Sequence, residues 1–397
     1  MKVPLLDLKL QYQRIRREIV SAVHEVLESQ QFILGPTLED FEKEMVRYLQ
    51  IDHAIGVSSG TDALFISLMA LEVGRDDAVI TTPFTFFSTV SSITRVGATP
   101  LFVDIDPLTF TISPEKTKET VSSLRGNKRN KLKAVIPVHL YGQCADMDSL
   151  TMITHKYHLK IVEDAAQALG ARYLSRGSSH FAGCGGDFGC FSFFPTKNLG
   201  GYGEGGMVVT HDKGMAERVR SLRHHGSRSQ QEQYYYDLIG INGRLDALQS
   251  AVLRVKLKYL EQWTSARRLN AERYNKMFKE TGLVTDRDIR VGKGKPIALP
   301  YVREGNYHVF NQYVIRAYER DSLKEFLTQQ GIGCGIYYPL PIHLQSCYKG
   351  LGYKKGSFPE AERAAKEVLA LPVYPELTIE QQELVVSTVE RFYKDKK

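Results

Sequence analysis

The sequence predicts an α/β fold in which a mainly parallel seven-stranded sheet is wrapped by helices and followed by a smaller α+β domain. Short runs rich in β-branched and aromatic residues alternate with segments of helical periodicity, a pattern typical of parallel strands joined by helices. The pair Glu163-Asp164 follows the apolar run 159–162, so a carboxylate lies at the carboxyl end of a predicted buried strand. Open α/β sheets place ligand-contacting groups at that end.

Seven runs have the composition of strands, and they are 54–57, 78–82, 100–103, 134–138, 159–163, 188–194 and 207–210. The intervening segments 62–71 and 147–157 have helical patterns. Apolar residues then recur at spacings of three and four from Leu245 to Tyr259, which predicts one long helix leaving the first lobe. The stretch 291–296, rich in glycine and lysine, is expected to be a loop.

The length of the chain predicts two domains. At 397 residues it exceeds what one hydrophobic core usually organises, and 43% hydrophobic residues are enough for two cores. We expect a large domain at 1–250 and a small C-terminal domain at 251–397. Segment 1–35 is expected to pack near the small domain.

Composition argues against several classes of protein. No apolar run approaches the roughly 18 residues of a membrane span, and the amino terminus lacks the apolar core of a signal peptide, so we expect a cytoplasmic protein with no membrane partner. The cysteines are odd in number and have no paired CxxC spacing, which argues against a disulfide framework and a zinc site. They are Cys144, Cys184, Cys190, Cys334 and Cys347.

The formal net charge of +7 raises the question of a nucleic-acid partner. Part of this charge lies in the basic stretch 125–133, which lacks interleaved aromatic residues. A solvated loop before the next strand is the favoured interpretation, and a nucleic-acid-binding module is the alternative. A mild positive bias also suits an enzyme whose ligands carry phosphates.

Lys197 is the most informative residue of the sequence. It lies in GCFSFFPTKNLGGYGEGG at 189–206, after an apolar strand-like run that Pro195 ends and before a series of glycines that let the backbone approach a bound group. A lysine in apolar surroundings can lose its proton near neutral pH, which a Schiff base requires. Together with Asp164, Lys197 supplies what pyridoxal phosphate needs: a carboxylate for the ring nitrogen and an amine for the aldehyde.

Further segments, taken in order, show what the chain resembles. They are PLLDLK at 4–9, ILGP at 33–36, SSGTDAL at 58–64, PVHLYG at 137–142, NGRLD at 242–246 and YPLPIHL at 338–344. With the Asp164 and Lys197 segments, they make the chain similar nearly end to end to the sugar aminotransferases of the DegT/DnrJ/EryC1/StrS group. The resemblance implies the fold type I architecture of pyridoxal phosphate enzymes.

The resemblance also implies how the cofactor phosphate is held. Gly60, Thr61 and Asp62 match the phosphate-binding segment, mostly through backbone groups at a helix start, which alone would be read as an ordinary capped helix. Ser192 matches another phosphate-binding position. Asn242 matches a residue that reaches the phosphate from the neighbouring subunit, so a homodimer with composite active sites is expected.

Four further residues are placed by the same resemblance. Phe86 is expected to stack against the pyridine ring, and Gln167 to lie near the ring hydroxyl, where some members carry histidine. Tyr338 and His343 are expected to contact substrate. Without the family, Phe86 would be read as a core aromatic and His343 as a structural histidine.

The implied reaction is transfer of an amino group from an amino acid, by family expectation glutamate, to a keto group of a UDP- or dTDP-linked sugar for amino-sugar or surface-polysaccharide synthesis. Lys197 would act as general base and acid, and Asp164 would keep the ring nitrogen protonated. Phe194 favours amination at C3, because enzymes acting at C4 often carry histidine there.

Three alternatives to this reaction remain. They are that the enzyme aminates C4 of the sugar, that the protein is a regulator which binds the cofactor without turnover, and that it is one of the dehydratases of this family. The dehydratases replace the lysine with histidine, so Lys197 argues against them.

Overall fold

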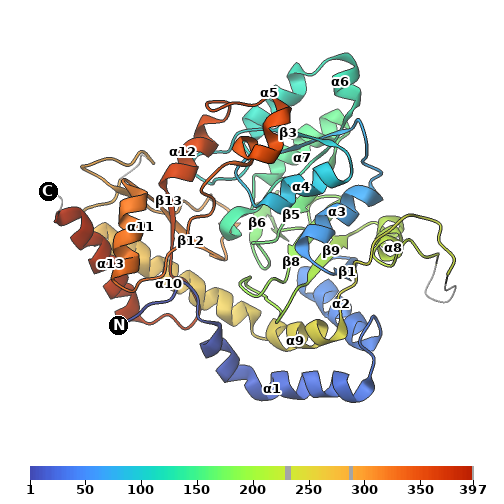
Figure 1. Cartoon of the computed structure of the whole chain (residues 1–397), viewed down its shortest axis with the longest axis horizontal. Coiled ribbons are helices and arrows are strands. Elements are labelled where there is room, and N and C mark those ends of the chain that lie inside the picture. The colour runs from blue at the N-terminus through green and yellow to red at the C-terminus, as the bar shows by residue number, and fades with distance from the viewer. Residues whose placement is uncertain (229–233, 286–288, 396–397) are drawn as a thin grey trace.

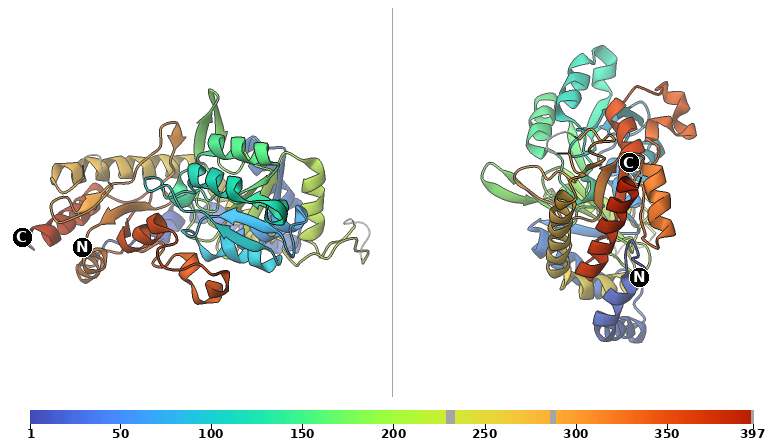
Figure 2. Two further views of the ribbon diagram at one scale, coloured as in Figure 1. Left: turned by 90° about the horizontal axis from the view of Figure 1, so that it is seen from above. Right: turned by 90° about the vertical axis from the view of Figure 1, so that its left-hand side faces the viewer.

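The computed structural model describes residues 1–228, 234–285 and 289–395. The chain forms a large lobe around one sheet and a smaller lobe that contains the carboxyl terminus (Figure 1). The two lobes lie end to end along the long axis of the molecule (Figure 2). No helix among the described residues is long and apolar enough to cross a membrane.

A seven-stranded sheet forms the centre of the large lobe and confirms the predicted α/β fold. Its strands, in spatial order, are β1 (His53–Val57), β9 (Gly206–Thr210), β8 (Phe188–Ser192), β5 (Lys160–Asp164), β4 (Leu132–Val135), β2 (Ala78–Thr81) and β3 (Thr99–Phe102). Strand β9 is antiparallel to both of its neighbours, and the other pairings are parallel. All seven strands correspond to runs predicted from the sequence.

Helices cover both faces of this sheet. The helices of the large lobe include α2 (Pro36–Leu49), α3 (Gly60–Ala70), α4 (Phe87–Arg95), α5 (Pro114–Ser123), α7 (Met147–Tyr157) and α8 (Lys213–Leu222). Successive side chains of β8 point to opposite faces of the sheet. Phe188 packs with residues of α3 and α8 on one face, whereas Phe191 packs with residues of α2 and α7 on the other. The sheet is therefore buried on both sides, as its apolar strands require.

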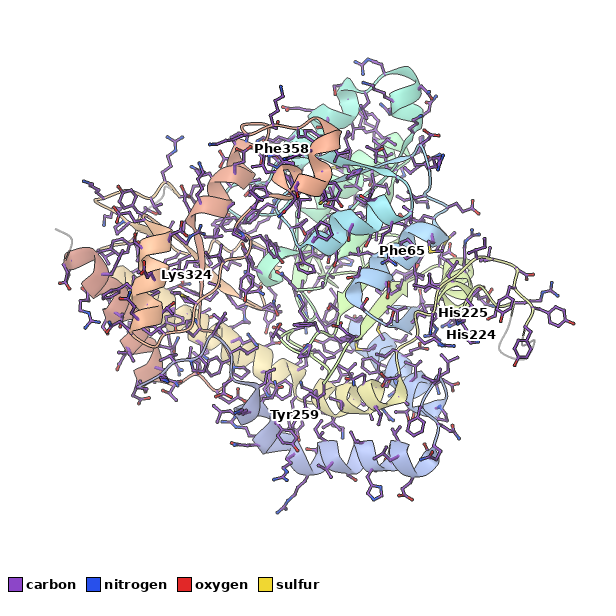
Figure 3. The ribbon with its side chains drawn as sticks, viewed as in Figure 1. Phe65, His224, His225, Tyr259, Lys324 and Phe358 are labelled. Carbon is purple, nitrogen blue, oxygen red and sulfur yellow. The ribbon has the colours of Figure 1, made fainter. Side chains whose placement is uncertain are left out.

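The sequence predicted one long helix after residue 245. This prediction is wrong, because the chain forms two helices there. Helix α9 (Ala247–Leu257) and helix α10 (Leu260–Glu280) are separated at Lys258 and Tyr259. Helix α9 packs against α1 (Leu8–Ser29) and α2, whereas α10 packs into the small lobe against α13 (Ile379–Lys394). Two partners in different directions require a change of axis, and Tyr259 lies at this change beside α1 (Figure 3).

The small lobe has its own sheet and core. Its strands β10 (Ile297–Ala298), β12 (Tyr313–Ala317) and β13 (Val368–Leu371) are all antiparallel. Its remaining elements are α11 (Arg320–Gln329), η2 (Ile342–Leu344), η3 (Ser346–Leu351) and α12 (Pro359–Glu367). The predicted loop 291–296 contains no helix or strand.

The amino terminus reaches the small lobe before α1 turns back beneath α9. The amide of Val3 donates to Gly331 O at 3.0 Å, the amide of Gly333 donates to Val3 O at 2.7 Å, and Val3 is buried in the core of the small lobe. The predicted boundary at residue 250 lies within α9, and the proposed division into 1–250 and 251–397 stays a prediction. Residues 286–288 and 396–397 of the second range lie outside the described residues.

Other elements carry no strong sequence signal. A hairpin of β6 (Arg172–Ser175) and β7 (Ser178–Phe181) pairs with β11 (Asn306–Tyr307). The basic stretch, expected to be a loop, contains the short helix α6 (Gly126–Asn130). Two of its lysines form ion pairs, Lys131 with Asp76 at 3.3 Å and Lys133 with Asp77 at 3.8 Å.

Candidate active site

A cavity of about 500 Å³ lies at the carboxyl ends of β5 and β8, next to the small lobe. Its volume is within the range of small-molecule sites. Eight of the predicted site residues line it, and they are Gly60, Thr61, Phe86, Asp164, Gln167, Ser192, Lys197 and Tyr338. The sheet edge thus brings together residues that are far apart in the sequence.

Lys197 lies in the loop after β8, where its amide donates to Phe194 O at 2.9 Å. Burial lowers the pKa of its amine to about 8, and the charge of Asp164 opposes this change. A substantial fraction of the amine is therefore neutral near physiological pH. The neutral amine is the form that attacks an aldehyde.

A second buried lysine shows that a lowered pKa alone does not identify the nucleophile. Burial also lowers the pKa of Lys256 in α9 to about 8. However, the Lys256 amine donates to Gly200 O and lies 4.9 Å from the ring centre of Tyr202. Only Lys197 of these two residues lines the cavity.

Asp164 ends β5 and is almost completely buried. Its Oδ2 accepts a hydrogen bond from Thr89 Oγ1 at 2.7 Å, and its Oδ1 accepts one from the amide of Ala166 at 3.2 Å. Burial raises the pKa of Asp164, and these two hydrogen bonds and the charge of Lys197 oppose this shift. The carboxylate is thus fixed in place beside Lys197.

The neighbouring Glu163 has a structural role, because groups of the protein occupy its carboxylate. Its side chain is fully buried and accepts hydrogen bonds from three amides in 183–186, at 2.6 to 2.9 Å. It also accepts from His139 Nε2 at 2.6 Å, because His139 Nδ1 accepts from the amide of Ala145 at 3.0 Å and Nε2 must carry the proton. Asp164 is therefore the carboxylate of the pair that is available to a ligand.

The start of helix α3 forms one end of the cavity. Ser59 Oγ caps this helix by accepting the amide of Asp62 at 3.0 Å. No protein partner is found among the described residues for the amides of Gly60 and Thr61, which leaves them available to an anion. A Cβ atom at Gly60 would lie 2.7 Å from Ser192 Cβ, so glycine permits the close approach of α3 to the end of β8.

Asp62 uses its amide to bind Ser59 Oγ, so its expected contact with the cofactor phosphate stays a prediction. Its carboxylate accepts from Ser58 Oγ at 2.6 Å and pairs with Arg95 at 3.3 Å, and the residue is not among those that line the cavity. This arrangement keeps the acidic side chain occupied away from a bound anion.

Aromatic side chains also line the cavity. Phe86 is 57% exposed in the single chain, and its ring centre lies 6.0 Å from that of Tyr338. The Gln167 amide group is held at both ends, since Oε1 accepts the amide of Tyr141 at 2.7 Å and Nε2 donates to Tyr338 Oη at 3.0 Å. Phe86 therefore offers a flat apolar face, and Gln167 a fixed polar group.

Two predicted residues lie away from the cavity of this chain. Asn242 is exposed and accepts a hydrogen bond from Arg244 Nη2 at 2.6 Å. His343 is buried against Phe358 and pairs with Glu362 at 3.1 Å. The expected roles of these residues, toward a partner's cofactor and toward substrate, stay predictions.

Residues 234–241, which lead to Asn242, form a projecting segment of the large lobe. His224 and His225 lie at its base (Figure 3), and Tyr234, Tyr235 and Tyr236 are between 55% and 83% exposed. The exposure of the three tyrosines argues against packing within the single chain.

Sequence reasoning missed several residues of the cavity. Thr85, Ser88, Glu204 and Gln312 line it, and Thr89 lies behind it in contact with Asp164. A contact between Thr89 and Asp164 has no signal in a single sequence, because 75 residues separate them. Glu204 lies within the glycine-rich motif and could have been noticed there.

The donor set fits pyridoxal phosphate. Lys197 supplies an amine, Asp164 a carboxylate, and Phe86 an aromatic face, and the first amides of α3 are suited to a phosphate. Lys197 is the only cation among the described residues lining the cavity, so the helix amides would meet much of the phosphate charge. No group of acidic, histidine or cysteine residues suited to a metal is found in the described ranges, where all five cysteines are free.

The fold and this donor set define a fold type I pyridoxal phosphate-dependent enzyme. The family model described as the DegT/DnrJ/EryC1/StrS aminotransferase family matches residues 13–390, and the chain belongs to this family. It is a pyridoxal phosphate-dependent sugar aminotransferase.

Relatives cover nearly the whole chain. The "Pleiotropic regulatory protein" of Geobacillus stearothermophilus is 46% identical over 99% of each chain. The UDP-N-acetyl-3-dehydro-alpha-D-glucosamine 3-aminotransferase of Acidithiobacillus ferrooxidans is 37% identical over 98% of this chain and 97% of the relative. The crystal structure of S. venezuelae DesV, in complex with a ketimine intermediate, is 38% identical over 99% of each chain with a TM-score of 0.90.

Proposed function

We propose that this protein transfers an amino group from L-glutamate to the C3 keto group of a UDP- or dTDP-linked sugar. The observation that carries the proposal is the convergence of Lys197 and Asp164 with the anion-binding start of α3 in one cavity. The product would serve amino-sugar or surface-polysaccharide synthesis, and we place the reaction in the cytoplasm.

Each of these residues has a separate task in the proposed reaction. Bound pyridoxal phosphate supplies an electrophilic aldehyde and an electron-accepting ring. The Lys197 amine would hold the cofactor through its aldehyde group and, when an amino acid has taken its place, would move a proton between the substrate Cα and the former aldehyde carbon as general base and acid. Asp164 holds the proton on the ring nitrogen, and the amides of Gly60 and Thr61 bind the phosphate.

Amination at C3 is supported by two observations. Phe194 lines the cavity next to the Lys197 loop, at the position where C4 enzymes of the family often carry histidine. The name of the Acidithiobacillus ferrooxidans relative specifies a 3-aminotransferase acting on a UDP-linked sugar. C4 amination is the alternative.

A homodimer completes the proposed site. Asn242 lies on an exposed segment outside its own chain's cavity, as a residue serving a neighbouring subunit must. The described cavity offers one lysine and no arginine, so a phosphorylated substrate needs further partners. A second copy of the chain is the proposed source.

A panel of nucleotide sugars tests the proposed substrate. The protein is converted to the pyridoxamine form with glutamate and mixed with UDP- and dTDP-linked 3-keto and 4-keto sugars, and return of the aldehyde absorption is followed. We expect the 3-keto sugars to react, and Phe194→His to lower their kcat/KM relative to the 4-keto sugars. Phe87→His is the matched control, because Phe87 is equally exposed, at 44%, but lies outside the cavity.

The name of the Geobacillus stearothermophilus relative also keeps a regulatory role as a second candidate. A regulator without turnover would bind the cofactor but fail to form the pyridoxamine form with any amino acid. The presence of both Lys197 and Asp164 in the cavity favours turnover. The glutamate half-reaction therefore decides between the two candidates before any sugar is added.

A further inference from the structure

A chain of hydroxyl groups leads from the cavity wall to Asp164. Thr85 lines the cavity just before α4, and Thr89 lies in the first turn of that helix. The two Oγ1 atoms are 2.7 Å apart, and Thr89 Oγ1 is 2.7 Å from Asp164 Oδ2. Both threonine side chains are buried, so water does not compete for these hydrogen bonds.

The direction of these hydrogen bonds follows from the charge of Asp164. An ionised carboxylate only accepts, so Thr89 must donate its one hydroxyl proton to Oδ2, and Thr85 must donate to Thr89. With the amide of Ala166 on Oδ1, two of the roughly four acceptor positions of the carboxylate are occupied. The remaining positions are available to a ligand.

We propose that Thr89, supported by Thr85, is a positioning residue that keeps Asp164 ionised and fixes its orientation toward the ring nitrogen of the cofactor. The inference rests on the role proposed above for Asp164. Burial raises the pKa of Asp164, and the Thr89 hydrogen bond is the largest effect that opposes this shift. Loss of that bond favours transfer of the proton from the ring nitrogen to Asp164.

Replacement of Thr89 by valine tests this role directly, since it removes the hydroxyl while nearly keeping the shape. The readout is the ¹⁵N NMR shift of the ring nitrogen in protein loaded with ¹⁵N-labelled pyridoxal phosphate, followed against pH. In Thr89→Val the ring nitrogen should lose its proton about one to two pH units lower than in the wild type. Thr89→Ser, which keeps the hydroxyl, should retain most of the wild-type behaviour.

A matched control and a double variant sharpen the test. Thr94→Val removes a threonine hydroxyl from the same helix, where it contacts Val90 O and Tyr348 rather than Asp164, and should leave the midpoint unchanged. Thr85→Val should shift the midpoint less than Thr89→Val does. The double variant should match Thr89→Val alone, because Thr85 acts through Thr89.

The outcomes separate this inference from the proposed function. If Thr89→Val folds, binds the cofactor and keeps the wild-type midpoint, the positioning role of Thr89 is overturned. The role proposed for Asp164 is unaffected by that result. A wild-type protein whose ring nitrogen is neutral throughout would overturn both. If Thr89→Val does not fold, Thr85→Val carries the test, and an unchanged midpoint there would overturn the chain of hydroxyl groups.

Discussion

At the scale of single residues, position in the cavity distinguishes Lys197 from Lys256. Burial lowers the pKa of both amines to about 8, so both can be neutral at physiological pH. Lys256 uses its amine to bind Gly200 O, whereas Lys197 lies beside Asp164 in the cavity. Chemistry at this site thus depends on a lowered pKa and on access together.

The pKa of Lys197 predicts how the apoprotein captures pyridoxal phosphate. Only the neutral amine reacts, so the rate should rise with pH through a midpoint near 8 and then level off. In Asp164→Asn the midpoint should move to lower pH, because the charge of Asp164 raises the pKa of Lys197. Stopped-flow absorbance measures both curves, and an upward shift in the variant would contradict this electrostatic coupling.

Gly60 should be sensitive to the smallest added side chain. In Gly60→Ala the new Cβ would lie 2.7 Å from Ser192 Cβ, so the start of α3 must move away from β8. Overpacking of this kind costs about 1–3 kcal/mol, and affinity for pyridoxal phosphate should fall at least about tenfold. Spectroscopic titration measures the affinity, and Gly74→Ala, whose Cβ meets only Val96 O at 3.9 Å, is the control.

At the scale of elements, the sequence predicted strands better than helix ends. Buried strands such as β5 and β8 are short apolar runs that a single sequence reveals, and the residues at their carboxyl ends include Asp164 and the loop of Lys197. The break between α9 and α10 depends on which partner each helix meets. The periodicity of the sequence shows which residues share one face of a helix. It does not show which other helix that face contacts.

Helix α9 also holds the loop that follows Lys197. Lys256 donates to Gly200 O, and Gln249 Oε1 accepts the amide of Tyr202 at 2.7 Å. This pair of contacts was not predicted, since a buried lysine looks like any helix lysine in sequence. The burial of Lys256 should make the free energy of unfolding depend on pH.

Lys256→Met should change that pH dependence in a defined direction. In the folded protein burial lowers the pKa of Lys256 to about 8, below the ordinary lysine value of 10.5, so the unfolded state binds more protons between these pH values. The free energy of unfolding of the wild type should therefore rise relative to that of Lys256→Met by up to about 1.4 kcal/mol per pH unit across this window. Urea unfolding at several pH values measures the difference, and a constant difference would show that Lys256 does not titrate as described.

At the scale of the whole molecule, two exposed apolar regions point to association. Helix α1 exposes Val20 at 52% and Leu27 at 47%, and the projecting segment exposes Tyr234 at 83% and Ile239 at 92%. Large exposed apolar side chains gathered in this way mark interaction surfaces. They accord with the proposed homodimer, whose composite site a single chain cannot reveal.

Ile239→Asp should weaken this association. The side chain makes little contact within its own chain, so the monomer should fold normally while the dimer dissociates at higher concentration than in the wild type. Cofactor should be released on the same dilution, because binding and assembly are linked. Sedimentation velocity with detection at the cofactor wavelength follows both, and Met152→Asp, on α7 and 63% exposed, is the control.

We expect Lys197 to carry the cofactor in the cavity that it shares with Asp164. The protein is loaded with pyridoxal phosphate, reduced with borohydride and digested, and the labelled peptide is identified by mass spectrometry. We expect the label on Lys197, in the peptide that contains Phe194 and Gly200, and no label in Lys197→Ala. A label on Lys256, the other buried lysine with a pKa of about 8, would contradict the assignment of the site.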